Sequence, residues 1–244
     1  MRHTIETLDI NGIPYTINTY YERRRSVRAS IGKNSINIRI PSSLSKEEQY
    51  RHLTKIKNWI QKRVQRHPER FKPKPQKEYK DGDLLKIGEE DYLVKINFKE
   101  KKSSSGKIKN NTIHLTLSNQ LPKEKQNEHI SHLIARSIAS KRINTLKEKI
   151  HTLNNRHFNQ RINKIFFKNN TSNWGSCSTK RNINISTRLL FAPDSVLEYV
   201  CIHELAHLIE HNHSPNFWEL VENVMPDYKE KVQWLKNNGH TCEF

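Results

Sequence analysis

The chain has 244 residues, of which 34% are hydrophobic, and its 43 Lys and Arg residues against 25 Asp and Glu give a formal net charge of +18. This length can bury the core of one large domain or of two small lobes, and three cysteines with no evident pairing (Cys177, Cys201 and Cys242) are typical of a reducing compartment. No apolar signal segment and no run of about 18 apolar residues occurs, which excludes a membrane-embedded protein and predicts a cytoplasmic one.

Two pairs of strands and a helix are predicted in the N-terminal part. Asn11-Gly12 separates segments 5–10 and 13–21, a strong hairpin signal, and segments 28–31 and 36–40 form a second pair. Ser45 is expected to cap a helix that extends to about residue 66, with Glu48 as its partner in a capping box. Apolar residues recur in this helix at helical spacing and are expected in a core: Leu53, Ile56, Trp59, Ile60 and Val64.

Basic residues are concentrated in three places outside the C-terminal part: Arg23-Arg24-Arg25, the proline-containing connector at 67–80, and Lys99–Lys102. A surface of this charge attracts the phosphates of a nucleic acid and needs no contacts to the bases. The alternative is a solvated basic surface with no such partner. No homeodomain, zinc-finger or RNA-recognition signature accompanies the charge.

The middle of the chain alternates strands and helices. Strands are predicted at 84–87, 92–98 and 112–117, with a polar tip at 101–110, and a long helix follows at 123–153. That helix is expected to pack alongside the helix that carries the candidate site. No internal repeat is evident. The elements predict an α+β fold with a β-rich lobe at 1–80 and a mixed strand and helix lobe at 81–244.

Strands predicted at 162–168 and 182–186 flank the segment Trp174-Gly175-Ser176-Cys177-Ser178, which combines an aromatic residue with glycine and small polar residues. One interpretation is an edge strand that lines a cleft, where Trp174, Gly175 and Ser176 contact an extended peptide. The other is a tight turn in which Trp174 fills a gap in the core. Cys177 is expected to pack rather than to act as a nucleophile.

The sequence His203-Glu204-Leu205-Ala206-His207 carries the clearest chemistry. Histidines at i and i+4 project from one face of a helix, so both imidazoles can reach one Zn²⁺. Glu204 lies beside them and is the candidate general base for a zinc-activated water. Residues 196–202 are apolar almost all round, so metal binding would offset the cost of burying these polar side chains. The pattern predicts a zinc-dependent hydrolase, most simply a peptidase.

His213 is the candidate third ligand. It follows His207 by six residues, at a predicted break where Ser214 caps the next helix and Pro215 takes its first position. A residue just beyond the helix end is free to turn back toward the metal.

His211 competes for this third position. In a continuous helix it rises about 12 Å from His203, too far for both to reach one ion with His207 between them. Glu210, Glu219 and His240 are the remaining alternatives, whereas Glu198 and Glu222 are expected to be surface charges or to support the ligands.

A peptidase also needs a donor for the oxyanion that forms during hydrolysis. Tyr228 and His240 follow the candidate site and are the candidates for this role. Met225 precedes Pro226 at a helix end and is expected in the core.

Several segments together resemble the YgjP-like metallopeptidase domain, which is related to the SprT-like and WLM zinc peptidases: Asn173–Ser178, Asn182–Asn184, His203–Trp218, Met225–Tyr228 and Trp234-Leu235. The resemblance implies a zincin-like lobe with an HExxH active-site helix. It also implies that His203, His207 and His213 bind zinc and that Glu204 is the catalytic base. One departure is Asn173, because the family commonly has a basic residue before Trp-Gly-Ser-Cys.

Three functional hypotheses follow. The first is a zinc metallopeptidase that hydrolyses peptide bonds of a peptide or protein substrate. The second is a basic nucleic-acid-binding module with a structural zinc. The third is a peptidase recruited to nucleoprotein, in which nucleic acid stimulates cleavage. None of the three involves a membrane.

Overall fold

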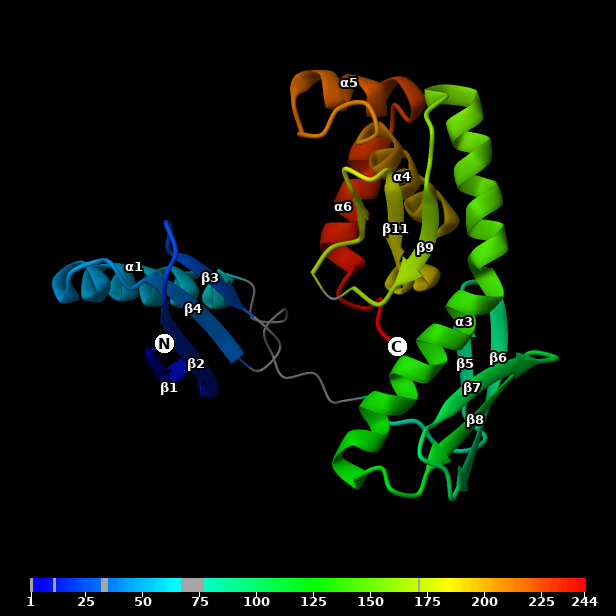
Figure 1. Ribbon diagram of the computed structural model, residues 1–244, viewed down its shortest axis with the longest axis horizontal. Coiled ribbons are helices and arrows are strands. Elements are labelled where there is room, and N and C mark those ends of the chain that lie inside the picture. Colours follow the sequence, from blue (N-terminus) through cyan, green and yellow to red (C-terminus); the bar gives the residue numbers. More distant parts are fainter. Residues whose placement is uncertain (1, 11, 32–34, 67–76, 171) are drawn as a thin grey trace. The chain divides into compact units, whose positions relative to one another are not determined.

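The computed structural model describes residues 2–10, 12–31, 35–66, 77–170 and 172–244, and Figure 1 shows its helices and strands. The chain divides into two compact units, Met1–Gln76 and Lys77–Phe244. Both contain strands and helices, so the predicted α+β class is confirmed. Most of the predicted connector, residues 67–76, lies outside the described residues. None of the described helices is long and apolar enough to cross a membrane.

A four-stranded sheet forms the first unit. Its two predicted hairpins are confirmed as β1 (Arg2–Ile10) with β2 (Ile13–Glu22) and β3 (Arg28–Ile31) with β4 (Ser35–Pro41), each antiparallel. A parallel pairing of β2 with β4 joins the hairpins in the order β1-β2-β4-β3. Gly12 takes a φ of +78° in the first turn, a conformation that L side chains rarely adopt. Asn11 lies outside the described residues.

Helix α1 (Lys46–Arg66) packs on one face of this sheet. The predicted capping box is confirmed, since Glu48 N donates to Ser45 Oγ at 3.2 Å and Ser45 N donates to Glu48 Oε2 at 2.8 Å. The expectation that Trp59 lies in the core is wrong: the residue is 47% exposed, with the Arg63 guanidinium over its ring. Trp59 projects about 100° round the helix from the stripe that packs on the sheet, formed by Leu53, Ile56, Ile60 and Val64.

The second unit begins with another four-stranded sheet: β5 (Leu84–Ile87), β6 (Glu90–Lys99), β7 (Ser105–Lys109) and β8 (Thr112–Ser118). Strand β7 lies where a polar tip was expected. Only Ile108 in it is a large apolar residue, so the alternation that marks a strand was weak. Gly106 faces α3 (Lys123–Leu153), where a Cβ would lie 2.5 Å from Ser137 Oγ.

The two sheets share one arrangement. The order β5-β6-β8-β7 matches β1-β2-β4-β3, including the parallel central pair, and each sheet is followed by a helix that packs on it. The expectation that the chain has no internal repeat is therefore wrong.

The rest of the second unit holds a small sheet and three helices. Strands β9 (Lys164–Lys168) and β11 (Asn182–Ser186) pair in parallel, and β10 (Gly175–Cys177) pairs with β11 to form an edge of the sheet. Two short turns connect these elements to the helices: the π-helical η1 (Asn154–Phe158) lies between α3 and β9, and the 3₁₀ turn η2 (Thr187–Phe191) lies between β11 and the next helix. The helices are α4 (Asp194–Ala206), α5 (Pro215–Val224) and α6 (Tyr228–Asn238).

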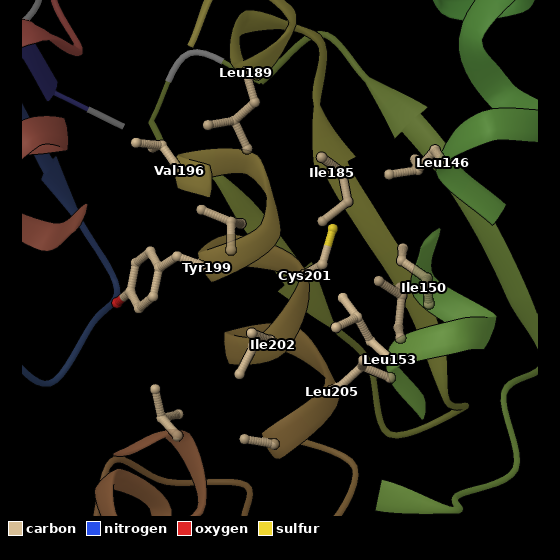
Figure 2. Close-up of a cluster of buried hydrophobic side chains, with 14 of the residues drawn as sticks. Leu146, Ile150, Leu153, Ile185, Leu189, Val196, Tyr199, Cys201, Ile202 and Leu205 are labelled. Atoms are coloured by element: carbon tan, nitrogen blue, oxygen red, sulfur yellow. The ribbon is translucent and has the colours of Figure 1, made fainter. Parts of the chain in front are cut away.

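A buried apolar cluster joins α3 to α4. In Figure 2, Leu146 and Ile150 of α3 point toward Cys201 of α4, with Ile185 of β11 beside them. Ile150 and Cys201 are 0% exposed. At the surface, Lys149 Nζ lies 2.6 Å from Asp194 Oδ2 in the first turn of α4. These contacts confirm the predicted packing of the two helices and hold α4 in place from one side.

Candidate metal centre

Helix α4 carries His203 and Glu204, and His207 is its C-cap residue. Pro193 precedes the helix, and its residues from Val196 to Ala206 are mostly buried. The helix ends at Ala206, earlier than the break that was predicted at His213. Leu208 N donates to Leu205 O at 2.9 Å and Ile209 N to Ala206 O at 3.0 Å, so the chain tightens into i→i+3 turns directly after α4.

Three imidazoles converge beside the end of α4. One ligand atom from each of His203, His207 and His213 lies within 4.8 Å of the others. Nε2 of His203 is 3.1 Å from Nε2 of His213. Because α4 ends early, the rise of a continuous helix no longer excludes His211. That residue lines the same cavity but is not in the cluster of ligand atoms.

Hydrogen bonds orient two of the rings. His207 Nδ1 lies 3.0 Å from the carbonyl oxygen of Glu210, which can only accept, so Nδ1 carries the proton and Nε2 keeps its lone pair. His203 Nδ1 lies 3.5 Å from Tyr199 Oη, one turn back along α4. This arrangement leaves Nε2 of His203 facing His213.

The donor set fits a tetrahedral cation. Two lone pairs that face each other at 3.1 Å repel unless a proton or a cation lies near them. Ligands about 2.0–2.1 Å from a tetrahedral Zn²⁺ are about 3.3 Å apart, close to this separation. Burial and the neighbouring His207 and His213 lower the pKa of His203 to about 3, so its ring is neutral at pH 7, as a ligand must be.

Aromatic rings form the wall behind the imidazoles. Phe217 is fully buried, and its ring centroid lies 4.9, 4.5 and 4.8 Å from those of His203, His207 and His213. The start of α5 fixes Phe217, because Ser214 Oγ accepts from Phe217 N at 3.3 Å and Pro215 is the first helical residue, as predicted.

Glu204 is buried beside the histidines, with 4% of its surface exposed. The Cys177 backbone N–H donates to its carboxylate, whereas Oε2 is buried and has no hydrogen-bond partner among the described residues. Burial raises the pKa of Glu204 to about 8, against an ordinary value of 4.5. A buried, half-satisfied carboxylate is costly for stability and is typical of a functional site.

Strand β10 passes close to this carboxylate. A Cβ on Gly175 would lie 2.5 Å from Glu204 Oε1 and 2.8 Å from Cγ, so this position has room for glycine alone. Asn173 Nδ2 donates to Gly175 O at 2.9 Å, and the Ser186 backbone N–H donates to Trp174 O at 2.8 Å. The backbone of this strand is therefore held against Glu204.

Both interpretations of the Trp174 segment describe part of the structure. Residues 175–177 form an edge strand, and the half-buried Trp174 packs against the core. The Arg188 guanidinium lies 4.1 Å from the centroid of the Trp174 ring, and Gly239 leaves space for the ring on α6. Cys177 is half-buried and burial raises the pKa of its thiol to about 11, which disfavours a nucleophilic thiolate.

A cavity of about 600 Å³ opens over the three histidines and Glu204. Its walls come from β10, from Tyr199 and Val200 of α4, and from one side of α6. The sequence interpretation missed the α6 wall and Tyr199, although the spacing of Tyr199 four residues before His203 was a usable signal. The α6 residues that line the cavity are Val232, Leu235 and Lys236.

The two residues predicted as oxyanion donors, Tyr228 and His240, lie outside the cavity. Tyr228 is buried in a stack, 5.3 Å from the Trp218 ring and 6.4 Å from the Tyr199 ring, and does not line the cavity. His240 is exposed and does not line it either. Glu219, an alternative ligand, is also exposed outside the cavity, whereas the backbone of Glu210 contacts His207.

Comparison with known families gives one match over most of the chain: residues 25–238 match the family described as YgjP-like, metallopeptidase domain. The chain belongs to the YgjP-like metallopeptidase family. This YgjP-like chain is a peptidase, and its family implies a divalent metal.

Two solved structures of metallopeptidase zymogens are similar to part of the YgjP-like chain. Abylysin from Pyrococcus abyssi is 26% identical, with 37% of this chain and 92% of that chain covered and a TM-score of 0.35. Jannalysin from Methanocaldococcus jannaschii is 21% identical, with 36% and 92% covered and a TM-score of 0.31. A comparison with curated proteins found no match.

Proposed function

We propose that the chain is a zinc-dependent metallopeptidase in which His203, His207 and His213 hold the metal and Glu204 is the general base. The observation that carries this proposal is the convergence of three imidazoles beside a buried carboxylate, one oxygen of which has no hydrogen-bond partner among the described residues. Family membership supports the reaction class.

The donor set favours zinc with an open coordination position. Imidazole nitrogens suit Zn²⁺, and three protein ligands are typical of catalytic zinc, whereas structural sites are closed by a fourth. The group found among the described residues has three members and borders a cavity. When bound, the ion would supply a Lewis acid that acidifies water and polarises the carbonyl of the scissile bond.

Glu204 would handle the protons of the reaction. A cation held by the histidines would favour the ionised form of this buried carboxyl group. The carboxylate then accepts a proton from the attacking water and returns it to the amine that leaves. The approach of Gly175 and the N–H of Cys177 hold that carboxylate in one position, so little reorganisation is needed during the reaction. Tyr199 orients His203 through Nδ1.

The cavity suits an extended peptide. One side of β10 pairs with β11 and the strand lines the cavity, so its backbone groups can bind a substrate strand beside Trp174, Gly175 and Ser176. Val232 and Leu235 make the facing wall apolar, which favours apolar substrate side chains there. For the oxyanion, Tyr228 and His240 remain proposals, although neither lines the cavity. None of the three cysteines, Cys177, Cys201 and Cys242, forms a disulfide among the described residues, which supports a reducing compartment such as the cytoplasm.

A nucleic-acid-binding module with a structural zinc is the second candidate, and the basic composition is what favours it. The two candidates differ in what Glu204 does. In a structural site this buried carboxylate would have no reaction to serve, so its replacement would leave every activity of the chain unchanged.

The test is cleavage of an unfolded protein by zinc-loaded wild type, Glu204→Gln and Glu198→Gln. Glu198 is a matched control on the same helix, 3.6 Å from Lys149 Nζ and outside the cavity. We expect Glu204→Gln to lose about 10²–10⁴-fold in rate while it keeps its zinc, and Glu198→Gln to cleave like wild type. Unchanged cleavage in Glu204→Gln would overturn the proposal.

A further inference from the structure

The first two sheets are copies of one another at a fixed spacing along the chain. Strand β2 (Ile13–Glu22) corresponds to β6 (Glu90–Lys99), and β4 (Ser35–Pro41) to β8 (Thr112–Ser118). Helices α1 and α3 begin at Lys46 and Lys123, which are as far apart in the sequence as Ile13 and Glu90.

The strand pairing follows the same spacing. Thr16 pairs with Ser35 in the first sheet, and Leu93 with Thr112 in the second. Buried residues are also kept at this spacing, as in the identical pairs Ile10 and Ile87, Tyr15 and Tyr92, and Ile36 and Ile113. Identical register without a gap is expected of a duplicated sequence, and each copy has kept its core.

The two copies differ on the sheet face opposite the helix. In the first sheet, Tyr20 pairs with Arg39, and Arg39 pairs with Arg28, so the three side chains form a row across β2, β4 and β3. The second copy has Asn97, Thr116 and Ser105 at these positions. The first copy therefore carries an aromatic ring and two guanidinium groups where the second carries small polar groups.

The row is a set of stacked planar groups. His3 of β1 lies opposite Tyr20, with ring centroids 4.4 Å apart and planes within 8° of parallel. On β4, the Arg39 guanidinium lies 5.0 Å from the Tyr20 centroid and its Nη1 is 2.9 Å from Glu22 Oε2. His3, Arg28 and Arg39 are exposed. We call these four residues, His3, Tyr20, Arg39 and Arg28, the planar row.

The charge of the chain is concentrated in the unit that carries this row. The segment 1–76 contains 17 Lys and Arg against 6 Asp and Glu, a net charge of +11 of the +18 in the whole chain. This segment is less than a third of the sequence. A polyanion is therefore the partner that this unit attracts.

We propose that the planar row is a binding surface for single-stranded nucleic acid. Stacked aromatic and guanidinium planes bind unpaired bases, and the arginines bind the phosphates between them. Charge alone would serve an acidic peptide equally well, but the carboxylates of such a peptide offer no aromatic ring to stack on the row, whereas every base of a nucleic acid does. The proposal does not depend on the peptidase mechanism, because the planar row belongs to the first unit, whereas the three histidines and Glu204 belong to the second.

The test is fluorescence anisotropy of a labelled 20-nucleotide single-stranded DNA with the full chain between 50 and 200 mM salt. The variant Tyr20→Asn/Arg28→Ser/Arg39→Thr puts the second copy's residues into the row. We expect it to bind at least about 10-fold more weakly, with the salt slope lower by about 1.4 for two lost phosphate contacts. Tyr20→Phe keeps the stacking plane and should bind within about 2-fold of wild type.

The matched control is Arg51→Gln/Lys55→Gln, which removes two charges from exposed positions of α1, on the other side of the sheet. It should bind within about 2-fold of wild type, and all three variants should cleave substrate like wild type. An equal loss in this control would mean undirected charge attraction and would overturn the proposal. So would no binding by wild type, or competition by poly-glutamate as strong as that by unlabelled DNA. The same sequence as RNA shows which of the two nucleic acids binds more tightly.

Discussion

Replacing Gly175 with alanine would put a methyl group against the carboxylate that we propose as the general base. The new Cβ would lie 2.5 Å from Glu204 Oε1, 2.8 Å from Cγ and 2.9 Å from Cδ. Carbon contacts are comfortable at about 3.5–4.0 Å, so the carboxylate or β10 must move by about 1 Å. A displacement of this size can cost about 10²-fold in rate, and overpacking costs about 1–3 kcal/mol in stability.

The assay is kcat/KM on a quenched peptide, together with zinc content and urea unfolding. The matched control is Gly82→Ala, in the same unit, where φ is +90° and no atom lies within 4 Å of the added Cβ. That control should lose about 1 kcal/mol of stability through backbone strain and keep its activity. Wild-type kcat/KM in zinc-loaded Gly175→Ala would refute the reasoning, because the position of the carboxylate would then not matter.

Three further predictions concern stability and metal affinity. Because burial raises the pKa of Glu204 to about 8, above its usual 4.5, the contribution of this group to the stability of the metal-free protein should be largest below pH 4.5, fall by up to about 5 kcal/mol as the pH rises from 4.5 to 8, and stay constant above that. Denaturant unfolding of chelator-treated Glu204→Gln should lack this loss, and an equal pH dependence in both proteins would contradict it. Tyr199→Phe removes the hydroxyl near His203 Nδ1, and it should weaken zinc binding about 10-fold in a competition with a chelator. An unchanged zinc affinity would contradict the role given to Tyr199. Ile150→Ala should destabilise the second unit by about 2–5 kcal/mol in urea, and a loss below about 1 kcal/mol would argue against the α3–α4 packing.

The elements of the candidate site that follow from local rules could be predicted from the sequence. The spacing of His203 and His207 needs only helical geometry, and the approach of His213 needs only the Ser214-Pro215 helix start. Both features are encoded within one short stretch of the sequence. The capping box at Ser45 and Glu48 was predictable for the same reason.

Features that depend on distant segments were not predictable. The fit of Gly175 against Glu204 joins two positions that are far apart in the sequence, and no local pattern marks it. The end of α4 at Ala206 was missed because residues 207–211 remain compatible with a helix. The repeat was missed because the copies agree mainly in buried positions that are widely separated along the chain, while their exposed residues have diverged.

The central claim is that three histidines hold one zinc ion, and the most direct test is the zinc content of purified chains by mass spectrometry. Wild type should contain one zinc per chain, and His213→Ala should lose most of it. His211→Ala is the matched control, since His211 lines the same cavity outside the ligand cluster, and it should keep its zinc. Full zinc in His213→Ala, or its loss from His211→Ala, would contradict the assignment of the third ligand, and a wild type without zinc would contradict the account as a whole.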